Sequence, residues 1–266
     1  MSDEPFSFTV FAKPWKHLAP PQLAAHVKAL GFTGVELPVR PGFAVEPDTA
    51  ERGLPEAAGV FEGLGLKIGS VAADPQEQVI AACGAAGVSI LRICVEIPKH
   101  LDYLSAIKQC QRQWDQLVPK LDEHGVTLGV QNHCGRCITH AMHLYNAIAR
   151  YDPKHVSAVW DPAHNALQGE DVDLALDVIW SHLVLVNLKN AYWLRENGPE
   201  AETARWRSYW TTGRHGLSDW PQVARELKRR GYRGDVCLSA EYTDQNAVDR
   251  LIAQDLAYAR KCFADV

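Results

Sequence analysis

The sequence has no long hydrophobic run, no basic tract and no linker, and each absence excludes a class of protein. Without roughly 18 consecutive apolar residues, a membrane-spanning helix is excluded. Lysine and arginine number 27 against 32 aspartates and glutamates, a net charge of −5, so we expect no nucleic-acid partner. The opening stretch MSDEPFSFTV lacks the pattern of a signal peptide, and we expect a cytoplasmic protein.

The seven cysteines do not suggest a disulfide framework, because their number is odd and a chain of 266 residues needs no covalent staples. Cys134 and Cys137 form a CxxC pair followed by His140, and such a pair can hold zinc or undergo redox chemistry. No second CxxC and no thioredoxin-like setting accompany it. We therefore interpret both as ordinary loop cysteines, with the redox or zinc pair as the alternative.

What the sequence does contain is a regular alternation of strands and helices. Hydrophobic residues make up 47% of the chain and charged residues 22%, which is typical of a folded globular protein. Short apolar runs alternate with longer stretches of helical periodicity. The runs predict strands over Ser7–Ala12, Gly34–Pro38, Leu66–Val71, Ser89–Val95, Thr127–Gln131, Val156–Trp160, Leu183–Leu188 and Val236–Ala240.

Helices are predicted over Pro21–Leu30, Thr49–Leu64, Pro75–Ala86, Leu101–His124, His140–Arg150, Val172–Trp180, Asp219–Arg230 and Gln245–Phe263. Apolar strands separated by helices predict a parallel sheet covered by helices. Eight strand–helix units in about 250 residues favour a closed (β/α)8 TIM barrel over an open doubly wound sheet. With no linker to divide the chain, we expect a single domain over residues 1–266.

One connection, residues 190–218, is long and rich in tryptophan, tyrosine and arginine. Loops that follow barrel strands form the active face, so we predict an active-face loop here, with Arg214 available to a carboxylate or phosphate. The alternative is that its aromatic residues form a small satellite core or a subunit contact of a homo-oligomer. The two interpretations are compatible with each other.

Four consecutive predicted strands end in a polar side chain that points into the barrel. Alternate residues of a strand share a face, and this parity turns Gln131, Asp161, Asn187 and Glu241 inward. Catalytic groups of barrel enzymes come from these strand ends, so we expect a site there. The structural alternatives are a helix cap for Asp161 and hydrogen-bonded structural amides for Gln131 and Asn187.

Further polar side chains are expected on the same face of the barrel. Lys189 can bind a substrate anion or pair with a carboxylate, and His133 and His164 are candidate substrate contacts. Glu36, at the end of the second predicted strand, is a candidate of lower rank.

Several stretches of the chain stand out together: GFTGVEL at 31–37 with VRPG at 39–42, LGVQNH at 128–133, WDPAH at 160–164, VNLKN at 186–190 and LSAEY at 238–242. They resemble the xylose isomerase-like TIM barrels that include sugar phosphate isomerases and epimerases. The similarity spans essentially the whole chain. It is specific for the superfamily and does not name a substrate.

The resemblance implies a metal site. In that family Glu, Asp, His and Glu from strands five to eight hold a divalent ion, and two carboxylates move protons between adjacent carbons of a keto sugar. By position, Asp161 and Glu241 correspond to the Asp and the last Glu, and His164 to a substrate-binding His. Gln131 replaces the first Glu, and Asn187 replaces the His of an H-x-K-D run.

The two amides change what the implied site can do. They leave two negative charges where the family has three. Such a site favours a harder, weakly held ion, and we expect a divalent metal (Mg, Mn or Zn) at low occupancy. An amide cannot accept a proton, so epimerisation by two carboxylates is impaired. Glu241 alone, with Lys189 or a histidine as acid, can still support isomerisation or elimination.

The sequence therefore predicts an isomerase or epimerase that abstracts a proton next to the carbonyl of a sugar, sugar phosphate or sugar acid. Glu241 is the expected base, with Lys189 and His164 as further catalytic residues. Substrate contacts are assigned to His133, His164, Arg214 and Glu36. The alternatives are a dehydratase or lyase on a keto sugar, and a degenerate barrel that binds carbohydrate or regulates. A repair nuclease is disfavoured for want of a basic groove and a multi-metal cluster.

Overall fold

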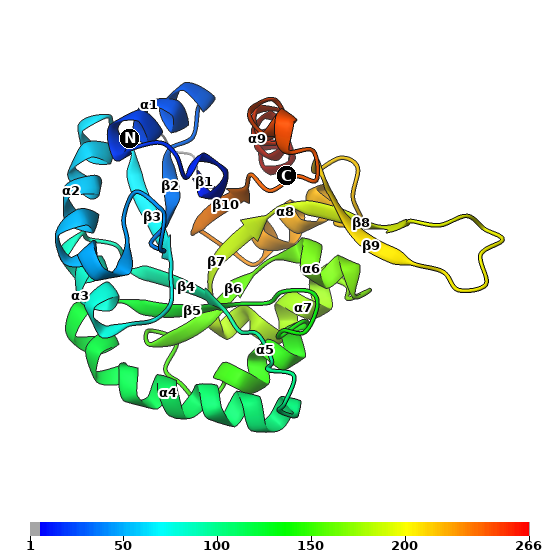
Figure 1. The fold of residues 1–266 in the computed structure, drawn as a ribbon, viewed down its shortest axis with the longest axis horizontal. Coiled ribbons are helices and arrows are strands. Elements are labelled where there is room, and N and C mark those ends of the chain that lie inside the picture. The colour runs from blue at the N-terminus through cyan, green and yellow to red at the C-terminus, as the bar shows by residue number, and fades with distance from the viewer. Residues whose placement is uncertain (1–5, 266) are drawn as a thin grey trace.

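Eight parallel strands close into a barrel in the computed structural model, which describes residues 6–265 (Figure 1). They pair in the order β1–β10–β7–β6–β5–β4–β3–β2, and the predicted (β/α)8 TIM barrel is confirmed. The opening residues MSDEP, part of the stretch behind the cytoplasmic expectation, lie outside the described range. The barrel strands are β1 (Ser7–Phe11), β2 (Gly34–Pro38), β3 (Lys67–Ala72), β4 (Ile90–Cys94), β5 (Thr127–Gln131), β6 (Val156–Trp160), β7 (Leu183–Leu188) and β10 (Asp235–Ser239).

Helices surround the barrel on its outer side (Figure 1). They are α1 (Pro20–Leu30), α2 (Ala50–Gly63), α3 (Glu77–Ala85), α4 (Tyr103–His124), α5 (Ala141–Ile148), α6 (Pro162–Leu167), α7 (Val172–Ile179), α8 (Trp220–Arg229) and α9 (Val248–Ala264). All predicted helices form within a few residues of their expected ends. The short α6 has no predicted counterpart, because its few residues do not complete a periodic pattern. Within residues 6–265, none of the helices combines the length and the apolar character that crossing a membrane requires.

Apolar side chains pack on both faces of the barrel sheet, as the alternation of residues along each strand predicts. Leu128, Trp160 and Leu238 are fully buried in the large cluster between strands and helices. A smaller cluster fills the barrel itself and consists of Phe11, Ala72, Ile90, Val159, Leu185 and Cys237. This alternation turns the side chains at the strand ends toward the barrel mouth.

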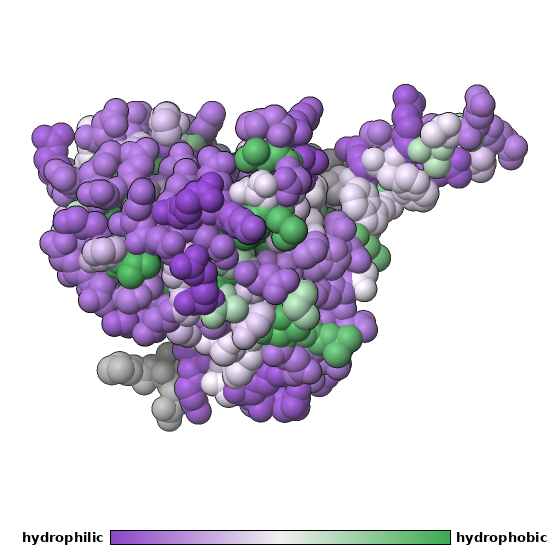
Figure 2. Space-filling model, turned by 90° about the horizontal axis from the view of Figure 1, so that it is seen from below, coloured by the Kyte–Doolittle hydropathy of each residue, from purple (hydrophilic) through white to green (hydrophobic). Residues whose placement is uncertain are grey.

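The segment predicted as a long loop over 190–218 contains an antiparallel hairpin of β8 (Asn190–Arg195) and β9 (Trp206–Thr211). It projects from the body of the molecule, as Figures 1 and 2 both show. Aromatic residues at facing positions stabilise it: Tyr192 pairs directly with Tyr209, and their rings stack with centroids 5.1 Å apart.

The base of this hairpin is fixed by the buried side chain of Asn190. Its Oδ1 accepts the backbone N–H of Ser218 at 2.9 Å, and its Nδ2 donates to the carbonyl of Gly213 at 2.8 Å. Gly216 is required beside it, because a Cβ there would lie 2.0 Å from Asn190 Oδ1. The returning chain therefore runs close to the barrel and brings Trp210 to its mouth.

Replacing Trp160 by alanine should lower the free energy of unfolding by about 3–5 kcal/mol, because the indole is fully buried and a cavity would remain. Trp206→Ala is the matched control: its ring is 57% exposed on β9, and the expected change is within about 0.5 kcal/mol. Urea denaturation of both variants measures the difference. Equal losses would contradict the assignment of Trp160 to the core.

Candidate active site

Two adjoining hollows open at the C-terminal ends of the barrel strands. The Arg92 hollow, of about 600 Å³, is lined by Arg92, Gln131 and Asn187 among others. The Trp210 hollow, of about 700 Å³, is lined by Trp210 and Tyr242. Four polar side chains line both hollows: Lys13, His133, Lys189 and Glu241. Three of the four predicted strand-end residues, Gln131, Asn187 and Glu241, therefore line a space large enough for a small molecule, and Asp161 is buried behind them.

Arg92 belongs to a buried ion pair. From the middle of β4, its Nε and Nη2 donate to the two carboxylate oxygens of Glu36, each at 2.8 Å. Its guanidinium also stacks over the ring of Phe11 at 4.7 Å. Burial opposes the charge of Arg92, but the adjacent Glu36 carboxylate outweighs it and raises the pKa of the guanidinium. Glu36 lines neither hollow, so its position does not support the predicted substrate contact.

Arg92 is a site residue that the strand-end pattern does not predict. The available signal was a single arginine at an inward position of the apolar run ILRIC. Its third nitrogen, Nη1, donates to Gln131 Oε1 at 2.9 Å. The ion pair thus reaches the first of the four predicted strand-end residues.

Gln131 also forms a hydrogen bond to Asp161, and so connects it to Arg92. Its Nε2 donates to Asp161 Oδ2 at 3.0 Å, and Asp161 Oδ1 accepts the backbone N–H groups of Ala163 and His164. Asn132 holds the backbone of Asp161 from the other side through two hydrogen bonds of 2.7 and 2.9 Å. Asp161 therefore caps α6, as its structural alternative predicts, while its other oxygen faces Gln131 and Lys189.

Lys189 lies between two carboxylates. Its Nζ is 3.6 Å from Asp161 Oδ2 and 3.3 Å from Glu241 Oε2, and it stands 4.5 Å from the centre of the Trp210 ring. Lys13 binds the other oxygen of Glu241 at 2.5 Å. Burial opposes the charge of Lys189, but Glu241 and Asp161 outweigh it and raise the pKa of the ammonium.

The two carboxylates differ in their ionisation. Burial raises the pKa of Asp161 to about 6, although Lys189 acts in the opposite direction. Burial also disfavours the charge on Glu241, yet Lys189 and Lys13 prevail and lower its pKa to about 2. Two carboxylates with pKa values moved apart are a common arrangement at catalytic sites.

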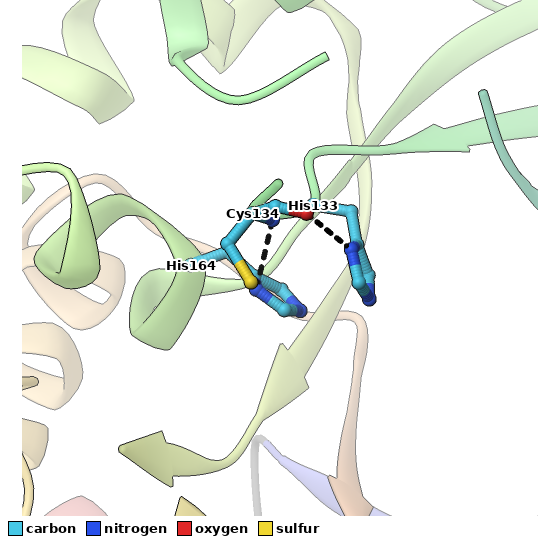
Figure 3. A group of neighbouring side chains, drawn as sticks. All are labelled: His133, Cys134 and His164. Atoms are coloured by element: carbon cyan, nitrogen blue, oxygen red, sulfur yellow. Dashed lines mark hydrogen bonds between the residues drawn. The ribbon is translucent and has the colours of Figure 1, made fainter. Parts of the chain in front are cut away.

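His133, Cys134 and His164 form a group beside these carboxylates, with potential ligand atoms within 4.8 Å of one another (Figure 3). His133 Nδ1 lies 2.9 Å from the Cys134 carbonyl oxygen, which can only accept, so Nδ1 carries the hydrogen and Nε2 keeps a lone pair. The backbone N–H of Cys134 donates to His164 Nδ1 at 3.1 Å, which places the hydrogen of the neutral ring on Nε2. The pKa of both histidines is lowered, and burial is the main cause.

This group does not fit a metal ion. The lone pair of His164 Nδ1 already accepts the backbone N–H of Cys134, which leaves only His133 Nε2 and the Cys134 thiol as free ligand atoms of this group. Cys137 is a free thiol too, and burial raises its pKa to about 11. These observations favour the interpretation of the CxxC pair as ordinary loop cysteines.

The remaining predicted site residues divide into two cases. Asn187 lines the Arg92 hollow, and its buried Oδ1 has no hydrogen-bond partner within residues 6–265. Arg214 lines neither hollow; its guanidinium stacks on the ring of Tyr258, 4.0 Å from the centre. The structure thus brings the strand-end residues, Lys189 and the two histidines together, and places Arg214 apart. His164 is fully buried and, unlike His133, lines neither hollow.

Replacing Arg92 by methionine should lower the free energy of unfolding by about 3–5 kcal/mol, because the carboxylate of Glu36 would stay buried without its partner. The double variant Arg92→Met/Glu36→Leu should recover most of this loss. Arg52→Met is the control, since the Arg52–Glu56 pair is exposed and contributes little. Urea denaturation gives all three values, and a loss no larger than that of the control would refute the structural role of the buried pair.

Several solved structures share this fold. They include D-psicose 3-epimerase with D-tagatose from Clostridium cellulolyticum H10 (14% identity, TM-score 0.74, 97% of this chain and 99% of that one) and the 3-keto-D-glucoside 4-epimerase YcjR from E. coli (14%, 0.73, 97% and 100%). An L-ribulose 3-epimerase is similar to the same degree (13%, 0.73, 97% and 95%). At these identities the likeness shows the fold alone.

Comparison of sequences gives the family. None of the curated proteins matches the chain significantly. The family model described as "Xylose isomerase-like TIM barrel" matches residues 24–262, nearly the whole length. The resemblance inferred from the sequence is therefore confirmed, and the chain belongs to the xylose isomerase-like TIM barrel family.

Proposed function

We propose that the protein isomerises or epimerises a small carbohydrate by moving a proton at the carbon next to a carbonyl group. The observation that carries this proposal is the buried ammonium of Lys189, held 3.3 Å from Glu241 and 3.6 Å from Asp161 at the edge of two hollows. Psicose, ribulose and keto-glucoside epimerases share the fold, which supports a substrate of this class.

Lys189 provides the positive charge that the reaction needs. Removing a proton next to a carbonyl moves negative charge onto the carbonyl oxygen, and a fixed cation in a water-poor site stabilises that charge. The raised pKa of Lys189 keeps the ammonium protonated at neutral pH. Its carboxylate partners and the ring of Trp210 hold it in one place, so little reorganisation is needed when the charge develops.

His133 is the candidate base at the hollows that no lysine binds, and it lines both of them, as Glu241 does. Its lowered pKa keeps the ring neutral at neutral pH, and Nε2 retains its lone pair because Nδ1 donates to the Cys134 carbonyl. Glu241, the base expected from the sequence, has a pKa of about 2 while both lysines bind it, which makes it a weak proton acceptor in the resting site.

We therefore assign proton abstraction to His133 and the positioning of Lys189 to Glu241. The imidazolium that His133 forms can return its proton to the neighbouring carbon while the hydroxyl proton moves to the former carbonyl oxygen, which completes an isomerisation with a single base. It can also act with a second proton donor on the opposite face of the substrate, which completes an epimerisation.

The hollows offer further contacts to a polyhydroxylated molecule. The unpartnered Oδ1 of Asn187 can accept a hydrogen bond from a hydroxyl, and the ring of Trp210 offers a face on which a sugar can stack. The guanidinium of Arg40 lines the Arg92 hollow and suits a carboxylate or phosphate. A sugar, a sugar phosphate and a sugar acid are all compatible with these contacts.

The reaction class can be tested with a panel of aldoses and ketoses, including D-psicose, D-tagatose and L-ribulose, their phosphates and their acids, in deuterated water. We expect one member to lose the proton signal of the carbon next to its carbonyl in ¹H NMR spectra. Lys189→Met should slow this exchange by about 10²–10³-fold, because the developing oxyanion loses its cation. Lys99→Met, at an exposed position after β4, removes the same charge and should leave the rate unchanged.

The same spectra separate the alternatives. A panel member that binds, shown by saturation transfer, but never exchanges its proton would favour the degenerate carbohydrate-binding barrel. New signals from a dehydrated product would favour the dehydratase or lyase. Absence of both exchange and binding across the panel would refute a carbohydrate substrate.

The identity of the base determines the pH profile. If His133 must be neutral, kcat/KM falls about tenfold per pH unit once the pH drops below its pKa, which lies under the ordinary 6.5, and is constant above it. If Glu241 were the base, its pKa of about 2 would add no limb in this range, where the Asp161 carboxyl, with a pKa of about 6, also titrates. His133→Asn should lower kcat by about 10²–10⁴-fold and abolish this acidic limb. Circular dichroism at each pH distinguishes loss of rate from loss of fold.

A further inference from the structure

We propose that the strand-end site holds no divalent ion, because Arg92 turns Gln131 into a hydrogen-bond donor toward Asp161 and Lys189 supplies the positive charge between the carboxylates. The resemblance to the family implies a metal at this place, and the residues present do not fit one. The mismatch lies in the ligand atoms themselves, whichever reaction the site catalyses.

The orientation of the Gln131 amide is fixed by its two neighbours. A guanidinium can only donate, so the amide oxygen faces Arg92 Nη1 at 2.9 Å. The amide nitrogen then faces Asp161 Oδ2 at 3.0 Å, where an ionised carboxylate accepts its hydrogen. Turning the amide over would set donor against donor and acceptor against acceptor. An ion next to Asp161 would therefore meet N–H hydrogens rather than an oxygen lone pair.

The carboxylate oxygens are engaged as well. Asp161 Oδ1 accepts backbone N–H groups at the start of α6, and its Oδ2 faces Gln131 Nε2 and Lys189 Nζ. Glu241 binds Lys13 with one oxygen and Lys189 with the other. An ion that bridged Asp161 and Glu241 would have to displace the ammonium of Lys189.

The remaining donor atoms are too few. His164 Nε2 lies 3.6 Å from Asp161 Oδ2, but in the neutral ring this nitrogen carries the hydrogen and has no lone pair for an ion. Asn187 Oδ1, at the end of β7, is buried and has no hydrogen-bond partner within the described part of the chain. This amide oxygen and His133 Nε2, which keeps its lone pair, are far from the near-octahedral set of oxygen ligands that magnesium demands.

The balance of charge also disfavours an ion. Within the ion pairs at the strand ends, the carboxylates of Glu36, Asp161 and Glu241 are matched by the cations of Arg92, Lys189 and Lys13. A divalent ion would add two positive charges to this set, and the amides at positions 131 and 187 bring no negative charge to compensate them. Uncompensated charge in a buried site is costly.

Metal binding can be tested directly, with Mn²⁺ as the probe and the electron paramagnetic resonance signal of free Mn²⁺ as the readout. We expect the wild type to show no site tighter than about 1 mM. Gln131→Glu/Asn187→His restores the family's ligands and should bind at least about tenfold more tightly. Gln113→Glu, on the exposed side of α4 outside the barrel, adds a negative charge away from the strand ends. It controls for the effect of the added charge alone.

Two outcomes of this titration count against the proposal. A wild-type site tighter than about 1 mM would overturn it. A double variant that binds no better than the wild type would refute the role given to the two amides.

Metal content of the purified wild type, measured by plasma emission spectrometry, gives a second test that needs no variant. Less than stoichiometric manganese, zinc or magnesium, and a melting temperature unchanged by EDTA, would support the proposal. About one bound equivalent that EDTA removes would overturn it. Neither readout uses sugar turnover, so failure here is distinct from failure of the proposed reaction.

Discussion

The site depends on the buried ion pair between Arg92 and Glu36. Removing a guanidinium and a carboxylate from water costs several kcal/mol, and this cost is offset only when geometry is good and the remaining N–H groups are satisfied. Here two parallel hydrogen bonds join the charges, and the remaining guanidinium nitrogen binds Gln131. Gln131 in turn orients Asp161, so a contact between β2 and β4 determines the hydrogen bonding at the ends of β5 and β6.

Lys189 connects this network to the other side of the barrel mouth. It faces Asp161 after β6 and Glu241 after β10, and Lys13 after β1 completes the set. The two carboxylates therefore meet different environments: burial dominates at Asp161, and two ammonium groups dominate at Glu241. That difference, rather than any difference in intrinsic acidity, separates their pKa values to about 6 and about 2.

The sequence predicts the strands that carry this site well, and it predicts the hydrogen bonds between their side chains poorly. The bounds of β5, β6 and β7 follow from apolar runs, and parity alone turns Gln131, Asp161 and Asn187 toward the mouth. The sequence does not reveal the partner of Arg92. Glu36 lies 56 residues earlier, and the two side chains meet across β3 inside the curved sheet. Ligand assignments by position consider each strand end alone, whereas hydrogen bonds between strands decide which lone pairs are free.

The hairpin shows the same limit on a larger scale. The runs NAYWLR and WRSYWT carry the aromatic residues typical of strands, but their position after a barrel strand indicated a loop. The hairpin affects the site through contacts with residues far along the chain. The backbone N–H of Trp210 donates to Thr243 Oγ1, and the backbone N–H of Thr243 donates to the Trp210 carbonyl, just beyond Glu241.

This pairing sets the indole ring of Trp210 against the Lys189 ammonium, where an aromatic face attracts the cation and takes the place of water. A drier site strengthens the field of a fixed charge, because fewer water dipoles screen it. The insertion therefore contributes to the electrostatics of the barrel mouth as well as to its shape. The cation that the proposed reaction needs is thus held by residues that follow β6 and β10 and by the hairpin, and no single stretch of sequence contains them all.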